Sequence, residues 1–481
     1  MFLDTVETAG LAHLSYVVGD ERAGVCAVVD PRRDVDVYLD LAARRAARVT
    51  HVVETHVHAD FVSGSRELAA RTGAPICAGA GGGYGFEVRE LGDGDEVALG
   101  AVVLRALHTP GHSPEHVCLA VRGGKGAEAP WGVFTGDTLL AGEVGRPDLL
   151  GDRAEAERHA RDLYASLRDR LLPLGDHLSV YPAHAKGSPC AGAIGDRHAT
   201  TIGYERLHSP HLRPVRDGDP AGFVRAVLDA APPAPTYYAR VKALNARGPA
   251  VLGAPLAVPA LDPVAFAAAA AAPDAVVVDA REIDAWAAAH VPGSLNIALR
   301  EEFPVWAGWM LRPEQQVLLV LPETGDGGAD ALAAVRGHLL RIGIERVGGS
   351  LQHGMRGWTE AGRDFARAGA IGVRELRARL DGERASHPAA GGAPAPQVLD
   401  VRDGQEWASG HVPGARHRFV PDVAAHAGEL DRARPVAVYC GSGYRASIAA
   451  SVLERAGFRD VATVLGSMAA WRAAGLPLEG A

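Results

Sequence analysis

The second half of the chain contains an internal repeat, which restricts the folds that this half can adopt. VVVDAREIDAWAAAHVPGSLNI begins at Val276, and VLDVRDGQEWASGHVPGARH begins at Val398. An Asp, an Arg and a His recur with one offset of 121 residues: Asp279 with Asp400, Arg281 with Arg402, and His290 with His411. Each copy continues with an apolar strand, a helix and a closing Gly-rich segment. We therefore expect two copies of one α/β unit, called here the first and the second copy.

The first half alternates short β-rich runs with loops and helical stretches. Strands are expected over residues 14–18, 25–29, 51–54, 102–107, 117–121, 133–136 and 178–182, and helices over 35–47, 64–72 and 220–231. The polar residues gather at the ends of the strands. This pattern predicts a layered α/β domain.

Composition excludes several classes of function. A length of 481 residues corresponds to about three domains, and a net charge of −9 leaves no basic surface for nucleic acid. The first residues lack a secretory pattern, and prolines interrupt the most apolar stretch, 249–273. Five scattered cysteines do not form a disulfide framework. We expect a cytoplasmic protein with no membrane partner, assembled as a homo-oligomer.

Histidines and aspartates directly follow several of the expected strands. The segments are THVHADF (55–61), HTPGHSPEH (108–116), FTGDTLL (134–140) and YPAHAKGSPC (181–190). In an extended segment His56 and His58 project to the same side, so that both imidazoles can approach one cation. A single histidine is more often structural, but four such segments together predict a metal site.

The order HxHxD, GH, GD, AH resembles the metallo-β-lactamase superfamily over about the first 250 residues. The resemblance implies a four-layer αββα sandwich with metal at one edge of the two sheets. Hydrolytic two-metal members, such as glyoxalase II, generally carry histidine at the position of Phe61, and phenylalanine cannot bind a cation. The remaining set, His56, His112 and Asp137, leaves about three positions of an octahedron open, as in oxygen-using non-haem Fe(II) enzymes.

The segments THVHADFVSG, HTPGHSPEH, TGDTLL and GRPDL (145–149) are similar to the persulfide dioxygenase family. The resemblance implies one Fe²⁺ per chain, with zinc as the less favoured occupant. It also implies the reaction of a low-molecular-weight persulfide, O2 and water to a thiol and sulfite. The implied metal ligands are His56, His112 and Asp137, and the implied outer or vestigial ligands are His58, Asp60 and His184.

Two residues near this site have two interpretations each. Arg146 either pairs with a carboxylate or phosphate of the substrate's thiol carrier, or forms a salt bridge within its loop. Cys190 either accepts a persulfide near the iron, as a catalytic thiol, or is a small packed residue.

The second copy contains YCGSGYRAS (439–447), in which Cys440 opens a loop that leads into a helix. The helix N-terminus, converging backbone N–H groups and Arg445 favour the thiolate. Four residues separate Cys440 from Arg445, whereas cysteine phosphatases have five. With LDVRDGQEWASGHVPGA, this segment resembles the rhodanese (sulfurtransferase) domain over about 373–481. The resemblance implies Cys440 and Arg445 as catalytic residues, and the loop residues Gly441, Ser442, Gly443 and Tyr444 as substrate-binding.

The first copy departs from the rhodanese pattern. It reads VLLVLPETGDGG, with Leu321 or Pro322 at the thiol position and no basic residue equivalent to Arg445. We therefore expect a dioxygenase domain over 1–250, an inactive rhodanese homology domain over 255–368 and a catalytic rhodanese domain over 372–481.

Together these features predict a persulfide dioxygenase fused to a thiosulfate/persulfide sulfurtransferase, acting in sulfide detoxification, with sulfite or thiosulfate as a partner. The first alternative is a zinc-dependent thioester hydrolase like glyoxalase II, fused to rhodanese domains that carry sulfur. The second alternative is a scaffold protein with a degenerate metal domain.

Overall fold

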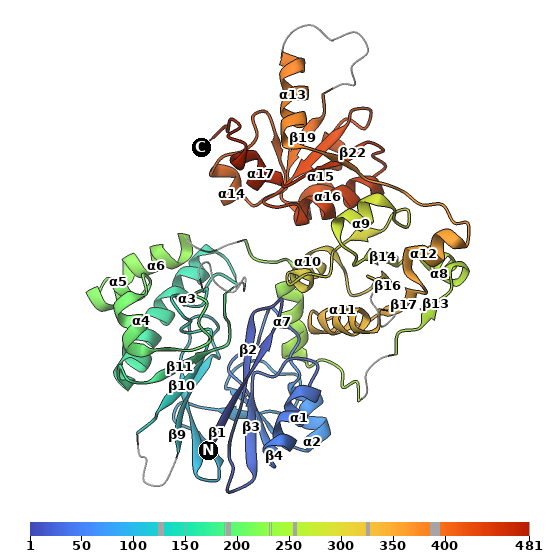
Figure 1. The fold of residues 1–481 in the computed structure, drawn as a ribbon. Helices are drawn as coiled ribbons and strands as arrows, with labels where there is room; N and C mark the ends of the chain where they lie inside the picture. The colour runs from blue at the N-terminus through green and yellow to red at the C-terminus, as the bar shows by residue number, and fades with distance from the viewer. Residues whose placement is uncertain are drawn as a thin grey trace. The chain divides into compact units, whose positions relative to one another are not determined.

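The computed structural model describes residues 1–123, 129–149, 151–186, 188, 194–229, 231, 233–253, 257–323, 328–384 and 395–480. The chain divides into two compact units, which Figure 1 shows as ribbons. The first unit comprises Met1–Leu256 and the short segment His338–Gly343. The second unit comprises Ala257–Gly337 and Ile344–Ala481.

The first unit contains two six-stranded sheets. In sheet order, the first has β1 (Phe2–Thr8), β2 (His13–Asp20), β3 (Val25–Val29), β4 (Arg48–Glu54), β5 (Ile76–Gly79) and β6 (Arg89–Leu91). The second has β12 (Thr200–Thr201), β11 (Ser179–Pro182), β10 (Gly132–Gly136), β9 (Val117–Gly123), β8 (Val102–His108) and β7 (Glu96–Leu99). In the first sheet β1, β2 and β3 pair antiparallel, and β3 to β6 pair parallel.

Helices cover the outer face of each sheet. Those on the first sheet are α1 (Asp36–Arg44) and α2 (Ser65–Thr72). Those on the second are α3 (Arg153–Ser166), α5 (Leu212–Asp217) and α6 (Pro220–Asp229), with α4 (Ile202–His208) next to α5. A π-helical turn (Leu167–Leu171) and a 3₁₀ turn (Leu172–Leu174) follow α3, and α7 (Tyr237–Arg247) follows α6.

Alternation along the strands divides the core into three layers. In β2, Val18 faces the core between the sheets and Val17 faces the helices. In β10, Phe134 lies between the sheets and Val133 packs under α3 and α6. Successive side chains of a strand point to opposite faces, so each strand contributes to two hydrophobic layers. The αββα sandwich expected from the sequence is therefore confirmed.

The second unit contains two five-stranded parallel sheets of one topology. The first copy has the order β13 (Ala260–Leu261), β17 (Val347–Leu351), β16 (Gln316–Val320), β14 (Ala275–Asp279) and β15 (Leu295–Asn296). The second has β18 (Gly369–Ile371), β22 (Val461–Val464), β21 (Val436–Tyr439), β19 (Gln397–Asp400) and β20 (Arg416–His417). Two rhodanese-like α/β domains therefore follow the sandwich, as expected.

Ten helices of the described residues accompany these sheets. They are α8 (Pro263–Ala270), α9 (Ile283–Ala288), α10 (Phe303–Met310), α11 (Ala329–Arg341), α12 (Gly354–Glu360), α13 (Val373–Arg384), α14 (Gly404–Ala408), α15 (Val423–His426), α16 (Tyr444–Arg455) and α17 (Ser467–Ala473). Two 3₁₀ turns flank α15, at Val420–Asp422 and Ala427–Glu429.

The repeated polar residues hold the same contacts in both copies. Asp279 pairs with Arg281 at 2.6 Å, and Asp400 pairs with Arg402 at 2.6 Å. Each arginine also donates to a backbone carbonyl eight residues further on. The repeated histidine stacks on a tryptophan, in the pairs Trp286–His290 and Trp407–His411. The offset of 121 residues therefore marks a shared internal scaffold.

Most of the expected elements of the first half are present, with shifted ends. The helix expected over 35–47 ends at Arg44, because Ala46 has a φ of +49°, which a right-handed helix does not permit.

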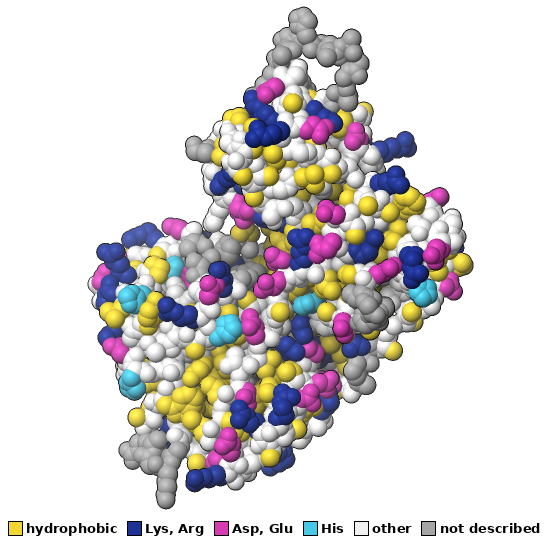
Figure 2. Space-filling view, in the orientation of Figure 1, with side chains coloured by type: hydrophobic (Ala, Val, Ile, Leu, Met, Phe, Trp, Pro, Cys, Tyr) yellow, Lys and Arg dark blue, Asp and Glu magenta, His cyan; other side chains and the backbone are white. Residues whose placement is uncertain are grey.

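On the face drawn in Figure 2, acidic and basic side chains are interspersed. Among the described residues, no helix has the length and apolar character needed to cross a membrane.

We predict that Arg402→Met destabilises the second copy by about 3–5 kcal/mol, because it leaves the fully buried Asp400 carboxylate without its cation. The measurement is a urea titration of the full chain, followed by hydrogen exchange of the β19 amides. The double variant Asp400→Leu with Arg402→Met, which buries no charge, should lose less stability. Unfolding of Arg402→Met at the wild-type urea concentration would show that the pair does not support this domain.

Candidate metal centre and sulfur-transfer loop

Four strands of the first unit end next to one another and present His56, His112, Asp137 and His184. His56 follows β4, and Asp137 follows β10 directly. His56 Nε2 lies 3.9 Å and His112 Nε2 lies 3.6 Å from Asp137 Oδ2. One ligand atom from each of these three residues lies within 4.8 Å of the others, and all three side chains are buried. The structure thus brings together the three residues that the sequence predicted as metal ligands.

Hydrogen bonds leave the same nitrogen of both imidazoles as an acceptor. Thr55 Oγ1 donates to Asp30 Oδ2 at 2.8 Å, so it accepts from His56 Nδ1 at 2.9 Å. His112 Nδ1 donates to the Arg146 carbonyl at 3.0 Å. Each histidine therefore directs a lone pair on Nε2 toward Asp137, which is the tautomer that a metal ligand requires.

Asp137 has one satisfied and one unsatisfied oxygen. Oδ1 accepts from His184 Nδ1 at 2.7 Å, whereas Oδ2, also buried, has no hydrogen-bond partner among the described residues. An orphaned carboxylate oxygen facing two imidazole lone pairs is the donor set that fits a divalent cation. The residues present therefore suit the metal that the sequence predicted.

The charges of the three groups also suit a cation. Burial opposes ionisation of Asp137, but His184 and His112 hold the pKa of its carboxyl below the ordinary range. Burial, followed by the nearby His58, lowers the pKa of His56 well below its usual value. Burial lowers the pKa of His112 as well. Neutral imidazoles beside an ionised carboxylate are the protonation states in which such residues bind metal.

His58 turns to a second cluster instead of the first. Its Nε2 lies 3.1 Å from Asp30 Oδ1 and 3.4 Å from Glu54 Oε2. Burial works against protonation, but the two carboxylates outweigh it and raise the pKa of His58 to about 10. Phe61 is fully buried, and the centre of its ring lies 4.5 Å from that of the His58 ring and 4.0 Å from that of the His13 ring, tilted against both. A hydrocarbon ring thus stands beside His58.

Asp60 and His184 form a further support. His184 Nε2 lies 2.8 Å from Asp60 Oδ2, on the side of the ring opposite Asp137. The third histidine of the 108–116 segment, His116, accepts from the Asp137 N–H at 3.1 Å. Burial lowers the pKa of His116 to about 3, so its ring is neutral and able to accept. These contacts orient Asp137 from its side chain and from its backbone.

Sequence reasoning missed the residue that holds the histidine loop from α7. Asn245 donates to the carbonyls of His58 and Phe61 at 2.9 and 2.7 Å, and accepts from the Ser63 N–H at 2.9 Å. It lies more than 180 residues from the loop and belongs to no local motif. Only its burial in the folded unit marks it.

The structure adds to one of the two open interpretations near this site. The Arg146 guanidinium is buried and forms two hydrogen bonds with Asp148, at 2.8 and 2.7 Å. The loop salt bridge is thus present, and a role of Arg146 in binding substrate stays a prediction. Cys190 lies outside the described residues, so its role also stays a prediction.

Cys440 follows β21 and begins the loop that enters α16. The Gly443 N–H donates to its sulfur at 3.1 Å, and Ser467 Oγ lies 4.0 Å from the sulfur. Arg445 pairs with Glu406 through two hydrogen bonds, of 2.5 and 2.8 Å, and so is anchored to α14. At the equivalent place in the first copy, Leu321 follows β16. The loop thus has a thiol at its base in one copy only.

The remaining described cysteines are core residues, as expected. Cys26, Cys77 and Cys118 are fully buried and unpaired with one another. Burial raises the pKa of the Cys118 thiol to about 12 and that of Cys26 to about 11. These thiols stay protonated and unreactive at neutral pH.

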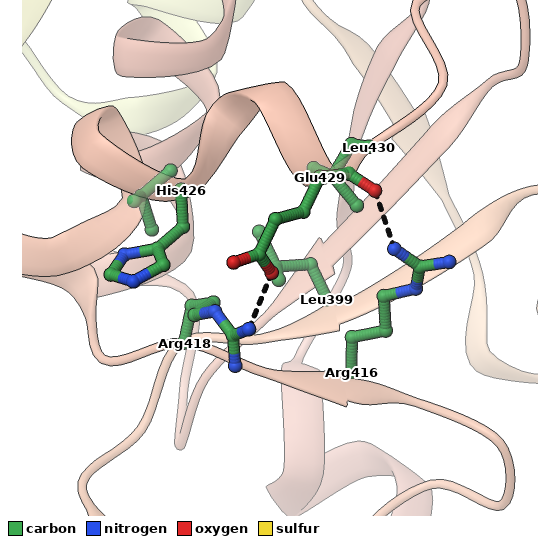
Figure 3. A pocket seen from close by; sticks show the side chains of 7 residues that line it. Leu399, Arg416, Arg418, His426, Glu429 and Leu430 are labelled. Atoms are coloured by element: carbon green, nitrogen blue, oxygen red, sulfur yellow. Dashed lines mark hydrogen bonds and ion pairs between the residues drawn. The ribbon is translucent and has the colours of Figure 1, made fainter.

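A small pocket of the second copy lies between β20 and α15 (Figure 3). Glu429 engages both of its arginines, since its carboxylate pairs with Arg418 and its carbonyl accepts from Arg416 at 2.6 Å. None of the loop residues 440–445 lines it. Arg416 and Arg418 are therefore engaged in contacts within the protein.

Family models match both halves of the chain. The metallo-beta-lactamase superfamily model matches residues 8–184, and the rhodanese-like domain model matches residues 262–361 and 382–474. The crystal structure of a metallo-beta-lactamase from Staphylococcus aureus subsp. aureus COL has a TM-score of 0.65 and 27% sequence identity. The match covers 73% of this chain and 98% of that one.

Curated relatives match the first half. A probable metallo-hydrolase of Burkholderia pseudomallei (strain 1710b) is 31% identical over 253 residues, which are 45% of this chain and 82% of the relative. A hydroxyacylglutathione hydrolase of Polaromonas sp. (strain JS666 / ATCC BAA-500) is 32% identical over 175 residues, which are 36% of this chain and 62% of the relative. The chain belongs to the metallo-beta-lactamase superfamily and carries two rhodanese-like domains after its metal-binding fold.

Proposed function

We propose that the first unit is an Fe²⁺-dependent persulfide dioxygenase and that the second copy is a sulfurtransferase that acts through Cys440. The observation that carries the first assignment is the set of His56, His112 and Asp137, with an unpartnered carboxylate oxygen directed at two imidazole lone pairs. Phe61 supports it, because a phenyl ring stands where a two-metal hydrolase generally has a ligand. In the proposal, a low-molecular-weight persulfide, O2 and water give a thiol and sulfite.

The ligand set supports an open catalytic iron site over a closed structural metal site. Bound there, Fe²⁺ would supply open positions at which persulfide and oxygen meet. The protein residues hold the geometry: Thr55 and the Arg146 carbonyl fix the ring orientations of His56 and His112. His184 fixes Asp137. Such outer hydrogen bonds strengthen the basicity of the ligands and keep them oriented.

The sulfurtransferase step follows from the Cys440 loop. The thiolate attacks the outer sulfur of thiosulfate, the S–S bond of the donor breaks with its electron pair, and sulfite leaves. The Gly443 N–H stabilises the sulfur and the resulting persulfide. A thiolate acceptor then attacks the outer sulfur of the persulfide, which regenerates Cys440 and forms RSS⁻. Run in reverse, the same steps convert sulfite from the dioxygenase into thiosulfate.

The alternative is a zinc thioester hydrolase, and the names of two relatives favour it. One is a probable metallo-hydrolase and the other a hydroxyacylglutathione hydrolase. The two activities separate cleanly in assays on one preparation with its iron and zinc content measured. Hydrolysis of S-lactoylglutathione without oxygen uptake on glutathione persulfide would replace the dioxygenase assignment with the hydrolase.

We predict that His112→Ala lowers both iron content and oxygen uptake on glutathione persulfide, the latter by at least about 10²-fold, because it removes one of three ligands. His108→Ala is the matched control from the same segment, since His108 is exposed and its ring forms a hydrogen bond with the Pro114 carbonyl at 2.9 Å. The control should retain wild-type iron and activity. Oxygen uptake by His112→Ala at the wild-type rate would contradict the ligand assignment.

We predict that Cys440→Ser abolishes sulfur transfer from thiosulfate to a thiol and leaves oxygen uptake on pre-formed glutathione persulfide unchanged. Serine retains the bond from the Gly443 N–H but cannot carry a sulfane sulfur. His112→Ala should lose oxygen uptake and keep sulfur transfer. The activity that each variant retains shows that its chain is folded. Transfer retained in Cys440→Ser would refute the sulfurtransferase assignment.

A further inference from the structure

An open pocket of about 160 Å³ lies between the two copies in the second unit. The first copy contributes Glu282, Ile283, Asp284 and Arg300, and the second copy contributes Ser442, Gly443 and residues 463–466. The pocket therefore has one wall from the copy that lacks a thiol and one from the copy that has it.

The wall from the second copy consists of the segments that surround the Cys440 sulfur. Gly443 lines the pocket, and its N–H donates to that sulfur at 3.1 Å. Gly466 also lines it, and the next residue, Ser467, accepts from the Cys440 N–H at 3.2 Å. A molecule in this pocket would adjoin the loop that carries the sulfur.

Direct hydrogen bonds hold the two walls together. Tyr444, in the Cys440 loop, donates to the Ala298 carbonyl at 2.7 Å. Asn296 accepts from Ser447 and its N–H donates to Ser451 at 3.2 Å, both residues of α16. β15 of the first copy lies against α16 of the second. These buried polar contacts make the first copy a fixed part of the surroundings of the Cys440 loop.

The charges of the first wall are of both signs. Arg300 pairs with Glu282 at 2.5 Å, and both side chains are largely exposed, at 42% and 58% of their surface. The Arg300 guanidinium also lies 5.7 Å from the centre of the Tyr444 ring. Asp284 has no ion-pair partner among the described residues, and its side chain is exposed. An exposed pair of this kind exchanges readily with a ligand, because it contributes little stability.

We propose that the first copy, although it has no thiol, supplies the recognition wall of the sulfurtransferase. Its Arg300, Glu282 and Asp284 select a thiol that bears both a carboxylate and an ammonium group, the amino-acid thiols, as the partner that exchanges sulfur with Cys440. The inference rests on the proposed sulfurtransferase function. The ligand carboxylate pairs with Arg300, and its ammonium pairs with Asp284 and Glu282. A carrier with several phosphates would meet two carboxylates and be disfavoured.

The exchange of sulfur between Cys440 and the acceptor thiol needs no further oxidant or reductant. The acceptor's thiolate attacks the outer sulfur of the Cys440 persulfide, the S–S bond breaks, and its electron pair returns to the Cys440 sulfur. The product is the persulfide of the amino-acid thiol, and the proton of the thiol passes to solvent. Such a persulfide belongs to the substrate class that the proposed dioxygenase consumes.

The test is steady-state sulfur transfer by the full-length protein, with thiosulfate as donor and a panel of acceptors. Glutathione and cysteine carry both charges, 3-mercaptopropionate only the carboxylate, cysteamine only the ammonium, and 2-mercaptoethanol neither. We expect Arg300→Gln to raise KM about three- to tenfold for the acceptors with a carboxylate. KM for cysteamine and 2-mercaptoethanol, and kcat for every acceptor, should stay at the wild-type values.

Asp284→Asn should give the complementary result, with raised KM for glutathione, cysteine and cysteamine only. Arg300→Lys should restore part of the affinity for carboxylates, and Arg312→Gln, at an exposed arginine of the same copy, is the matched control. An equal loss with 2-mercaptoethanol would show a merely structural role of Arg300. Unchanged KM throughout would overturn the proposal, and so would a lower wild-type KM for coenzyme A, added to the panel as the phosphate-bearing acceptor, than for glutathione. The Cys440→Ser variant tests the proposed sulfurtransferase function alone, and the Arg300 and Asp284 variants test the choice of acceptor. A failure of the function can therefore be told apart from a failure of the recognition proposal.

Discussion

Burial of the ionised Asp137 carboxylate is the constraint on which the N-terminal site depends. A charge removed from water costs several kcal/mol unless partners compensate it, and among the described residues this carboxylate has a hydrogen-bond partner on one oxygen only. The second oxygen faces His56 and His112, whose orientations are fixed by hydrogen bonds from behind. A cation would complete this arrangement. The cost of burying the carboxylate is met on folding, so the ligand residues are already held in place when a metal binds.

Close backbone packing makes this burial possible. A Cβ on Gly145 would lie 1.8 Å from the Asp137 carbonyl, and one on Gly136 would lie 2.4 Å from His116 Nε2. Gly136 also has a φ of +48°, a conformation that side chains disfavour. The glycines of the GD and GRPDL segments therefore have a steric role around Asp137, separate from any contact with substrate.

The two rhodanese-like copies show how scaffold and chemistry separate within one fold. The Asp–Arg pair and the Trp–His stack are present in both copies, and each arginine also links the end of its strand to the segment after the following helix. The residue that follows the strand differs, since Leu321 follows β16 and Cys440 follows β21. A copy without this thiol thus keeps the same sheet order and the same buried polar pair.

The sequence by itself determined the strands, the repeat and the residues that end the strands of the metal domain, because period, turns and polar strand ends are local properties. The four-layer sandwich was expected from the resemblance of these segments to the metallo-β-lactamase superfamily, and the two buried faces of each strand were found in the folded unit. Tertiary structure alone decided the partners: Asn245 on the histidine loop, Asp30 and Glu54 around His58, and Glu406 on Arg445. Most of these contacts join segments that are far apart along the chain, and such a separation leaves no periodic pattern in the sequence. The contact between His58 and Glu54 depends instead on the side-chain conformation of His58, which burial and charge fix in the packed structure.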